Sequence, residues 1–308
     1  MISTRTDLAM EAFEGAEGGA LPGVRVSRWE ESGVEVTEVL VTDNEAARAL
    51  GKPKGSYLTL ESPLFRERDP DARLAVSALL AEELARLVPG SEDGSPVLVV
   101  GLGNRNITPD SLGPAVADKT LVTRHMLTST YAHTNMKSVC AIAPGVLGVT
   151  GVESMELVEA LVKAIEPRAI LCVDSLAARD SRRIGSTIQL TNTGIQPGAG
   201  VGNHRKPLTE QTVGRPVISV GMPTVVYAAT LARDAFAWLD AQTGDGADHE
   251  AALADMENTL LSGELGEMIV TPREIDSIVE DAAGVIAGAI NRALQPALSD
   301  AEIAAMMD

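Results

Sequence analysis

Two aspartates stand where a parallel β-sheet would place reacting groups. Asp110 lies in GLGNRNITPDSLGP, residues 101–114, which continues from the apolar run VLVVG, and Asp174 directly follows the apolar run AILCV. Ligands of an open parallel sheet bind beyond the carboxyl ends of its strands, so these two carboxylates can face one crevice. Two carboxylates that share a water molecule can serve as general base and general acid. The simpler alternative for each aspartate is a helix N-cap, because Asp accepts hydrogen bonds from the first N–H groups of a helix.

Two glycine-rich segments could bind an anionic group. GLGNRN, residues 101–106, begins like a dinucleotide-binding fingerprint but has Asn106 in place of the third glycine, so it gives little support for a nucleotide site. PGAGVGNHRK, residues 197–206, combines three glycines with the basic residues His204, Arg205 and Lys206. Backbone N–H groups beside basic side chains can hold a carboxylate or an oxyanion. A surface loop explains the same segment equally well.

Other common catalytic patterns are absent from the sequence. There is no Gly-x-Ser-x-Gly motif, which argues against a serine hydrolase. The four histidines lack the spacing of a zinc site; they are residues 125, 133, 204 and 249. Both cysteines, Cys140 and Cys172, lie in apolar runs, so Cys172 is predicted to be a small buried hydrophobe rather than a nucleophile. Two cysteines also agree with a reducing compartment.

The elements that must position the two aspartates follow a repeated pattern of a short apolar run and then a helical segment. Because the runs are continuously apolar rather than alternating, both of their faces should be covered, which predicts a mainly parallel sheet between layers of helices. The predicted strands are residues 97–101, 139–143, 169–173 and 217–221, and the predicted covering helices are residues 111–128, 151–165, 224–239 and 273–294. Before them, alternating runs at 24–29 and 34–42 predict a β-hairpin, and residues 71–88 predict an amphipathic helix.

Composition limits the class of protein. The chain has 308 residues, of which 45% are apolar and only 3% aromatic, so we expect a folded protein with an aliphatic core. Lysine and arginine number 25 against 43 aspartates and glutamates, and the formal charge of −18 disfavours nucleic-acid binding. With no apolar leader or long apolar span, we expect a cytoplasmic protein that neither crosses nor binds a membrane. The polar, acidic residues 241–266 are expected to form a surface insertion.

Nine strings spread over nearly the whole chain carry a family resemblance: RTDLAMEA (5–12), GSYLTLES (55–62), VVGLGNRNITPDSLGP (99–114), TRH (123–125), AIAPGVLGVTGVES (141–154), VDSLAAR (173–179), STIQLTNTGIQPGAGVGNHRK (186–206), PVISVGMPTVV (216–226) and VTPREID (270–276). Together, and in this order, they resemble the spore germination proteases, which degrade small acid-soluble spore proteins. So many long strings are far more specific than any single motif.

The resemblance implies a fold similar to that of hydrogenase-maturation peptidases, a three-layer α/β/α sandwich, here with a smaller β-rich N-terminal part. It also implies an atypical aspartic peptidase whose essential aspartates match Asp110 and Asp174, with no cofactor and no metal. The resemblance further implies that the protein is a homotetrameric zymogen of the forespore and spore core. The implied substrates are small acid-soluble spore proteins, cut after an acidic residue and before Leu, Ile or Phe.

The resemblance further implies a propeptide of residues 1–7, which leaves residues 8–308 as one peptidase domain. Family processing falls between the acid and the apolar residue of RTDLA, which corresponds to the bond between Asp7 and Leu8. The string TDLAME resembles the sites cut in spore proteins, and tethering would give it a high effective concentration. The leader is shorter than usual for the family, and so is the 241–266 region.

Two alternatives remain open from the sequence. The first is a metal-assisted peptidase of the hydrogenase-maturation type, in which Asp174 and His125 would bind the metal. The second is a non-catalytic module that binds spore proteins. The basic residues His204, Arg205 and Lys206 are candidate contacts for acidic substrate residues in any of these cases. A nucleotide-binding oxidoreductase comes third.

Overall fold

The computed structural model describes residues 6–16, 21–90, 94–127, 136–196, 206–243 and 268–307. Within them the strands form one nine-stranded sheet in the order β1-β2-β3-β7-β8-β6-β4-β5, with β9 paired to β8. Their bounds are β1 Val24–Glu31, β2 Val34–Val41, β3 Gly55–Glu61, β4 Val97–Gly101, β5 Val139–Ile142, β6 Ala169–Ala178, β7 Thr187–Thr191, β8 Val217–Tyr227 and β9 Ile269–Val270. Strands β8, β6, β4 and β5 are parallel, and β1, β2, β3 and β7 continue the sheet in antiparallel pairing.

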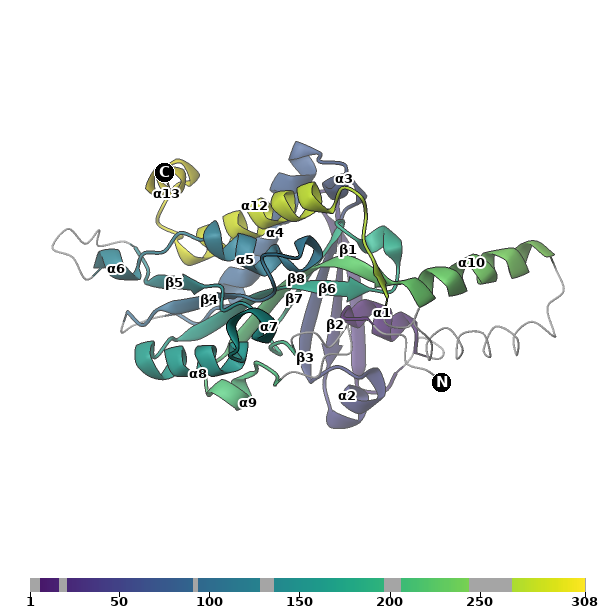
Figure 1. The fold of residues 1–308 in the computed structure, drawn as a ribbon, viewed down its shortest axis with the longest axis horizontal. Helices are drawn as coiled ribbons and strands as arrows, with labels where there is room; N and C mark the ends of the chain where they lie inside the picture. Colours follow the sequence, from purple (N-terminus) through teal and green to yellow (C-terminus); the bar gives the residue numbers. More distant parts are fainter. Residues whose placement is uncertain are drawn as a thin grey trace.

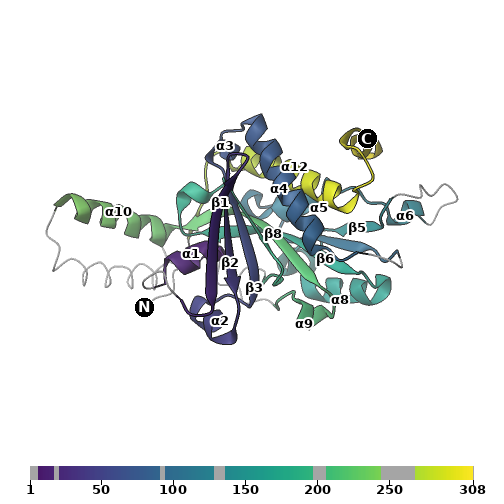
Figure 2. The same ribbon diagram turned by 180° about the vertical axis from the view of Figure 1, so that it is seen from behind.

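Helices cover both faces of this sheet, as the apolar runs predict (Figure 1). One face packs against α4 (Pro70–Leu87), α5 (Leu112–Asp118) and α12 (Ile275–Leu294) in the largest apolar cluster of the described residues. The opposite face packs against α8 (Ser154–Ile165) beside the parallel strands and against α1 (Ala9–Glu14) and α2 (Asn44–Leu50) beside the antiparallel strands. The view from behind shows β1, β2 and β3 standing alongside this core (Figure 2). The fold is an α/β/α sandwich on a mixed sheet.

Shorter elements connect these layers. They are α3 (Pro63–Arg66), the 3₁₀ turn η1 (Thr108–Asp110), α6 (Arg124–Leu127), α7 (Leu147–Thr150), the 3₁₀ turn η2 (Ser181–Arg183), α9 (Glu210–Val213), α10 (Ala228–Thr243) and α13 (Asp300–Met307). None of the helices in the described parts of the chain combines the length and apolar character needed to cross a bilayer. Of the insertion expected at 241–266, the first three residues end α10, and the others lie outside the described residues.

The sequence places two strand ends too early. Strand β6 continues through Asp174 to Ala178, so the prediction that Asp174 follows the strand is wrong, and β8 continues to Tyr227, so a helix from 224 is wrong as well. The two extensions pair with each other in parallel and have a register shift opposite Pro223, the kind of bulge at which a strand accommodates proline. The two strands are extended because they pair with each other, not because each is a continuous apolar run. The hydropathy of the sequence therefore did not predict where β6 and β8 end.

The helix predicted over 111–128 is also too long. Helix α5 ends at Asp118, where the N–H of Lys119 turns to the carbonyl of Val116. The chain then extends, because Asn291 of α12 accepts the Leu121 N–H at 2.8 Å and donates to the Lys119 carbonyl at 3.1 Å. A distant helix therefore decides where α5 stops.

Candidate active site

Asp174 lies inside β6 and is only 6% exposed. It pairs in register with Gly221 of β8, and Gly221 pairs with Gln189 of β7. Residues paired across strands point to the same face of a sheet, so the side chains of Asp174 and Gln189 lie on one face with a glycine between them. Leu176 packs over that glycine: a Cβ placed on Gly221 would lie 2.6 Å from Leu176 Cγ. This face carries α8, α1 and α2.

Asp110 is half-buried and belongs to η1, in the loop between β4 and α5. The loop is held against the extended strands by hydrogen bonds from Thr224 Oγ1 to the Pro109 carbonyl, at 2.7 Å, and from the Leu102 N–H to the Val173 carbonyl, at 2.8 Å. Val173 directly precedes Asp174. The loop that carries Asp110 therefore packs against the backbone next to Asp174.

Glycines make this close packing possible. Gly103 has a φ of +113°, and a Cβ at this position would lie 2.0 Å from the carbonyl oxygen of Asp110. At Gly113 a Cβ would lie 2.4 Å from the carbonyl oxygen of Val173. Gly103 thus lets the loop fold back onto Asp110, and Gly113 lets it approach β6, so the close packing explains Gly103 of GLGNRN without a nucleotide.

Residues 6–8, which lead into α1, cross the same face of the sheet. The Asp7 N–H donates to the Ala177 carbonyl at 2.9 Å, and Asp7 Oδ2 accepts from the Ala177 N–H at 2.8 Å, so the segment lies beside the extension of β6. Leu8 and Ala9 are fully buried in the apolar cluster that contains Leu176. The bond predicted for self-processing is consequently enclosed by the body of the protein.

Two side chains bind the peptide units around Leu8. Gln189 donates from Nε2 to the Asp7 carbonyl at 3.2 Å and accepts the Ala9 N–H at Oε1 at 2.7 Å. Lys52, from the turn between α2 and β3, donates from Nζ to the Asp7 and Thr6 carbonyls, both at 2.9 Å. Burial lowers the pKa of Lys52, while the nearby Asp7 and Glu11 act to raise it. These contacts are to main-chain atoms and so do not depend on the side chains of the bound segment.

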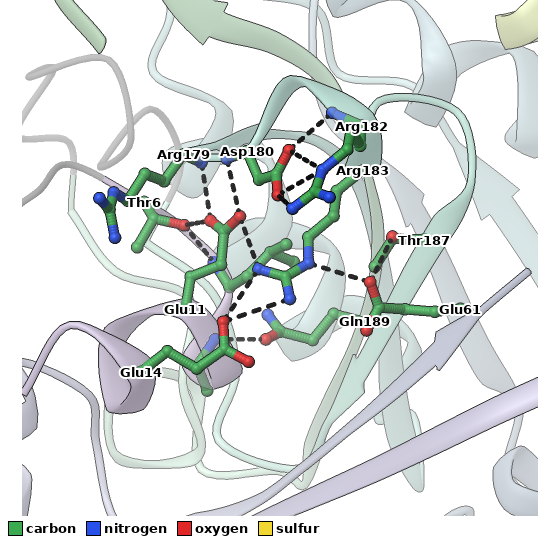
Figure 3. Close-up of polar contacts among 12 residues, drawn as sticks. Thr6, Glu11, Glu14, Glu61, Arg179, Asp180, Arg182, Arg183, Thr187 and Gln189 are labelled. Carbon is green, nitrogen blue, oxygen red and sulfur yellow. Dashed lines mark hydrogen bonds and ion pairs between the residues drawn. The ribbon is translucent and has the colours of Figure 1, made fainter. Parts of the chain in front are cut away.

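The N-terminal segment is also held through the carboxylate of Glu11, a residue that is only 2% exposed. It accepts from the N–H groups of Arg179 at 2.7 Å and Asp180 at 2.9 Å and from Arg183 Nη1 at 2.9 Å (Figure 3). Thr6 Oγ1 also donates to it. Each donor compensates for the cost of burying this charge.

Arg183 is the centre of this group of charges. It bonds to Glu61 at 2.9 Å and to Glu14 at 3.2 Å as well as to Glu11 (Figure 3). Burial alone would lower the pKa of Arg183, but the charge of Glu61 and the hydrogen bonds that Arg183 donates to Glu11 and Glu61 raise it overall. The guanidinium therefore stays charged and ties α1 to β3.

A cavity of about 160 Å³ opens beside the Asp7 carbonyl. Its lining includes Asp7, Lys52, Gln189, Ser219 and Gly221. Among the described residues, Ser219 Oγ is buried without a hydrogen-bond partner. The cavity thus lies on the face of the sheet that Asp174 shares.

The other predicted site residues lie elsewhere or cannot be described. Lys206 forms an ion pair with Glu159 of α8, and His204 and Arg205 lie outside the described residues. His125 is exposed on α6, two residues after Thr123, whose N–H bonds to Val139 at the start of β5.

The position of His125 bears on the metal-assisted alternative. Val139 is level with Ala169 at the start of β6, through Val97 of β4. Asp174 is five residues further along β6, about 16 Å at the usual rise per residue, so the structure does not bring His125 to it. Within the described residues, no group of three or more His, Cys, Asp or Glu side chains is arranged to hold a metal ion.

Cys172 is fully buried on the same face as Asp174. Burial first, and then the charge of Asp174, raise the pKa of its thiol far above the usual range. Since the thiolate is the nucleophilic form, Cys172 is not suited to nucleophilic catalysis. This agrees with its prediction as a buried hydrophobe.

Sequence reasoning did not single out Lys52, Gln189 or Arg183. Lys52 lies in an ordinary turn sequence, GKPKG, and Gln189 is the middle residue of the alternating strand β7, TIQLT. A buried polar residue in a strand needs a partner, and this was the signal available at Gln189.

An α/β/α sandwich that binds a segment of chain by its main-chain groups, on the sheet face that also carries a buried aspartate, has features expected of an enzyme that acts on peptides. The profile of the germination protease family matches residues 5–255. The germination protease of Clostridium tetani is 41% identical over 96% of this chain and 97% of its own length, and that of Priestia megaterium is 36% identical over 95% and 94%. The chain belongs to the germination protease family and is a peptidase.

One solved structure with a similar arrangement is the [NiFe] hydrogenase maturation protease HycI from Thermococcus kodakarensis KOD1. It is 16% identical, and the match covers 69% of this chain and 98% of HycI with a TM-score of 0.37.

Proposed function

We propose that this chain is an endopeptidase that begins the degradation of small acid-soluble spore proteins during germination, with a water molecule activated by Asp110 and Asp174. The observation that carries the proposal is the packing of the Asp110 loop against the backbone next to Asp174 on β6, a strand whose extension also bonds to Asp7 of the N-terminal segment. Family membership supports the peptidase activity. The aspartic mechanism is our interpretation of the geometry.

In this mechanism one carboxylate accepts a proton from the water as its oxygen attacks the peptide carbonyl carbon. The other carboxyl group, protonated at the start, donates its proton to the nitrogen that leaves. The carbon–nitrogen bond breaks, and the products are a new carboxyl terminus and a new amino terminus.

The same proposal includes a self-processing zymogen. Residues 1–7 would be removed by cleavage between Asp7 and Leu8, and the main-chain hydrogen bonds that hold Asp7 and Ala9 on the face of Asp174 support this. We further propose that substrates are cut after an acid and before Leu, Ile or Phe, that His204, Arg205 and Lys206 contact acidic substrate residues, and that the working form is a homotetramer in the spore core.

The test is the cleavage of a purified acid-soluble spore protein by variants of the full chain. Asp110→Asn and Asp174→Asn should each lower kcat by at least about 10³-fold, while Asp71→Asn, an exposed aspartate in the first turn of α4, should leave it unchanged. Fragment masses should show cuts between an acid and Leu, Ile or Phe. Full activity of either variant would refute the aspartic mechanism, binding without cuts would favour the binding module, and activity lost on chelation would favour the metal-assisted alternative.

A further inference from the structure

The carbonyl oxygen of Asp7 has unusual surroundings for a main-chain oxygen beside a strand. Its two donors are both side chains, Lys52 Nζ at 2.9 Å and Gln189 Nε2 at 3.2 Å, and they come from different elements. This oxygen belongs to the peptide bond between Asp7 and Leu8. Two preorganised donors aimed at one carbonyl oxygen are the arrangement that stabilises the negative charge of a tetrahedral intermediate.

We propose that Lys52 and Gln189 form the oxyanion-binding site of this peptidase, which takes the oxygen of whichever peptide bond is cut. The inference rests on the proposed function, since it treats the Asp7–Leu8 bond as a bound substrate. It adds two catalytic residues to the two aspartates. The N-terminal segment then marks how a substrate lies in the site.

The position of the two donors relative to Asp174 fits this role. Gln189 is two strands away from Asp174 in the same cross-strand row, about 10 Å between Cα atoms at the usual strand spacing. The residue between them is Gly221, so β8 contributes no side chain to the row, and Leu176 of β6 packs over this glycine.

Gln189 is oriented by the bound peptide itself. Because the Ala9 N–H donates to Oε1 at 2.7 Å, the Nε2 group must point toward the Asp7 carbonyl. One amide therefore binds the main chain on both sides of Leu8, whatever the side chain there. A substrate that replaces this segment would meet the same pair of groups.

Lys52 supplies the second hydrogen-bond donor. Burial lowers the pKa of its ammonium group overall, although Asp7 and Glu11 act to raise it. An amine donates a hydrogen bond to the oxygen in either protonation state, and preorganised donors stabilise a developing negative charge. The second bond of Lys52, to the Thr6 carbonyl, fixes the position of Nζ.

In the chemical step Lys52 and Gln189 act only as hydrogen-bond donors. As the water oxygen forms a bond to the carbonyl carbon, one aspartate takes the water proton and the carbonyl π electrons move to the oxygen, where Lys52 and Gln189 donate to it. When the electrons return, the carbon–nitrogen bond breaks and the nitrogen takes a proton from the other aspartic acid. Neither Lys52 nor Gln189 needs to gain or lose a proton.

The competing interpretation is that Lys52 and Gln189 only anchor the N-terminal segment. The two interpretations predict different kinetic results for a spore protein that is added as a separate substrate. Anchoring predicts changes in self-processing and stability but an unchanged kcat on an acid-soluble spore protein. An oxyanion site predicts a loss of kcat with little change in KM, because the donors act mainly in the transition state.

The experiment uses the full chain with Lys52→Met, Lys52→Arg, Gln189→Glu and the control Lys54→Met, an exposed lysine of the same turn. Lys52→Met keeps most of the side-chain length without the hydrogen-bond donor, and Gln189→Glu keeps the acceptor for Ala9 without the donor. We expect Lys52→Met and Gln189→Glu to lower kcat by about 10²-fold or more, with KM within about threefold. Lys52→Arg should recover part of the loss, and Lys54→Met should match the parent.

Thermal unfolding of each variant separates loss of fold from loss of chemistry. If Lys52→Met does not fold, Gln189→Glu decides the question, since it is nearly isosteric. A kcat within about threefold of the parent in the folded variants would overturn the oxyanion site. The proposed function fails separately, if Asp110→Asn or Asp174→Asn keeps full activity.

Discussion

At the scale of residues, the site is defined by polar groups whose partners lie far away in the chain. The bonds of Asp7 to Lys52 and to Gln189 and of Glu11 to Arg183 join residues 45, 182 and 172 positions apart. Local spacing could identify Asp110 and Asp174, because each stands at a recognisable strand or loop position. It could not identify Lys52, Gln189 or Arg183, because only the folded sheet brings them to the N-terminal segment.

Glu11 gives a prediction about stability. Glu11→Gln leaves Arg183 with one buried partner fewer, and breaking a buried ion pair costs about 3 to 5 kcal/mol. The matched control is Glu14→Gln on the same helix, whose carboxylate bonds to the same arginine but is 37% exposed. An exposed pair contributes less than about 1 kcal/mol. Urea unfolding of both variants should show this difference, and equal losses would contradict the role assigned to burial.

Tyr57 gives a prediction about alkaline pH. It is 3% exposed, and burial raises its pKa to about 12 from 10.0, partly offset by a hydrogen bond with Thr193. In the unfolded chain Tyr57 ionises near pH 10, whereas the folded chain keeps its proton, so stability falls as pH rises from about 10 to 12. The loss approaches about 3 kcal/mol for two pKa units.

The control for this effect is Tyr57→Phe, which removes the ionising group and also the hydrogen bond to the Pro53 carbonyl. The free energy of unfolding of the variant, measured between pH 9 and pH 12, should fall less steeply than that of the parent. Parallel curves would show that another group causes the alkaline loss.

At the scale of elements, the extensions of β6 and β8 decide where the site lies. The sequence predicts the starts of both strands correctly, since continuous apolar runs indicate buried parallel strands. It ends them at Asp174 and Gly221, because an acid and a glycine interrupt the apolar pattern. The structure continues both strands because each is the other's hydrogen-bonding partner, and such a pairing leaves no trace in either run alone.

The conformation of the Asp110 loop depends on a glycine. Gly103→Ala would force a side chain at a φ of +113° and into the carbonyl oxygen of Asp110. We expect a loss of about 1 to 3 kcal/mol and a lower kcat, because the loop that carries Asp110 must move. Gly148→Ala in α7 has no atom within 4 Å of the added Cβ and should preserve both. Chemical denaturation with an activity assay compares them, and an unchanged kcat in Gly103→Ala would contradict the loop's role.

At the scale of the whole molecule, one sheet joins the N-terminal hairpin to the peptidase core through the pairing of β3 with β7. The N-terminal segment then lies across this junction and bonds to β6, β7 and the turn before β3. Because it is held by so many groups, removal of residues 1–7 would leave Leu8 as a buried amino terminus. The net charge of −18 disfavours binding of the molecule to nucleic acid.

The most direct test of the central claim is the intact mass of the purified full chain before and after incubation under processing conditions. The account predicts that the parent chain loses residues 1–7 and begins at Leu8, whereas Asp174→Asn and Asp110→Asn keep their full mass. A chain beginning at Leu8 in either variant, prepared free of other proteases, would contradict catalysis by these two aspartates.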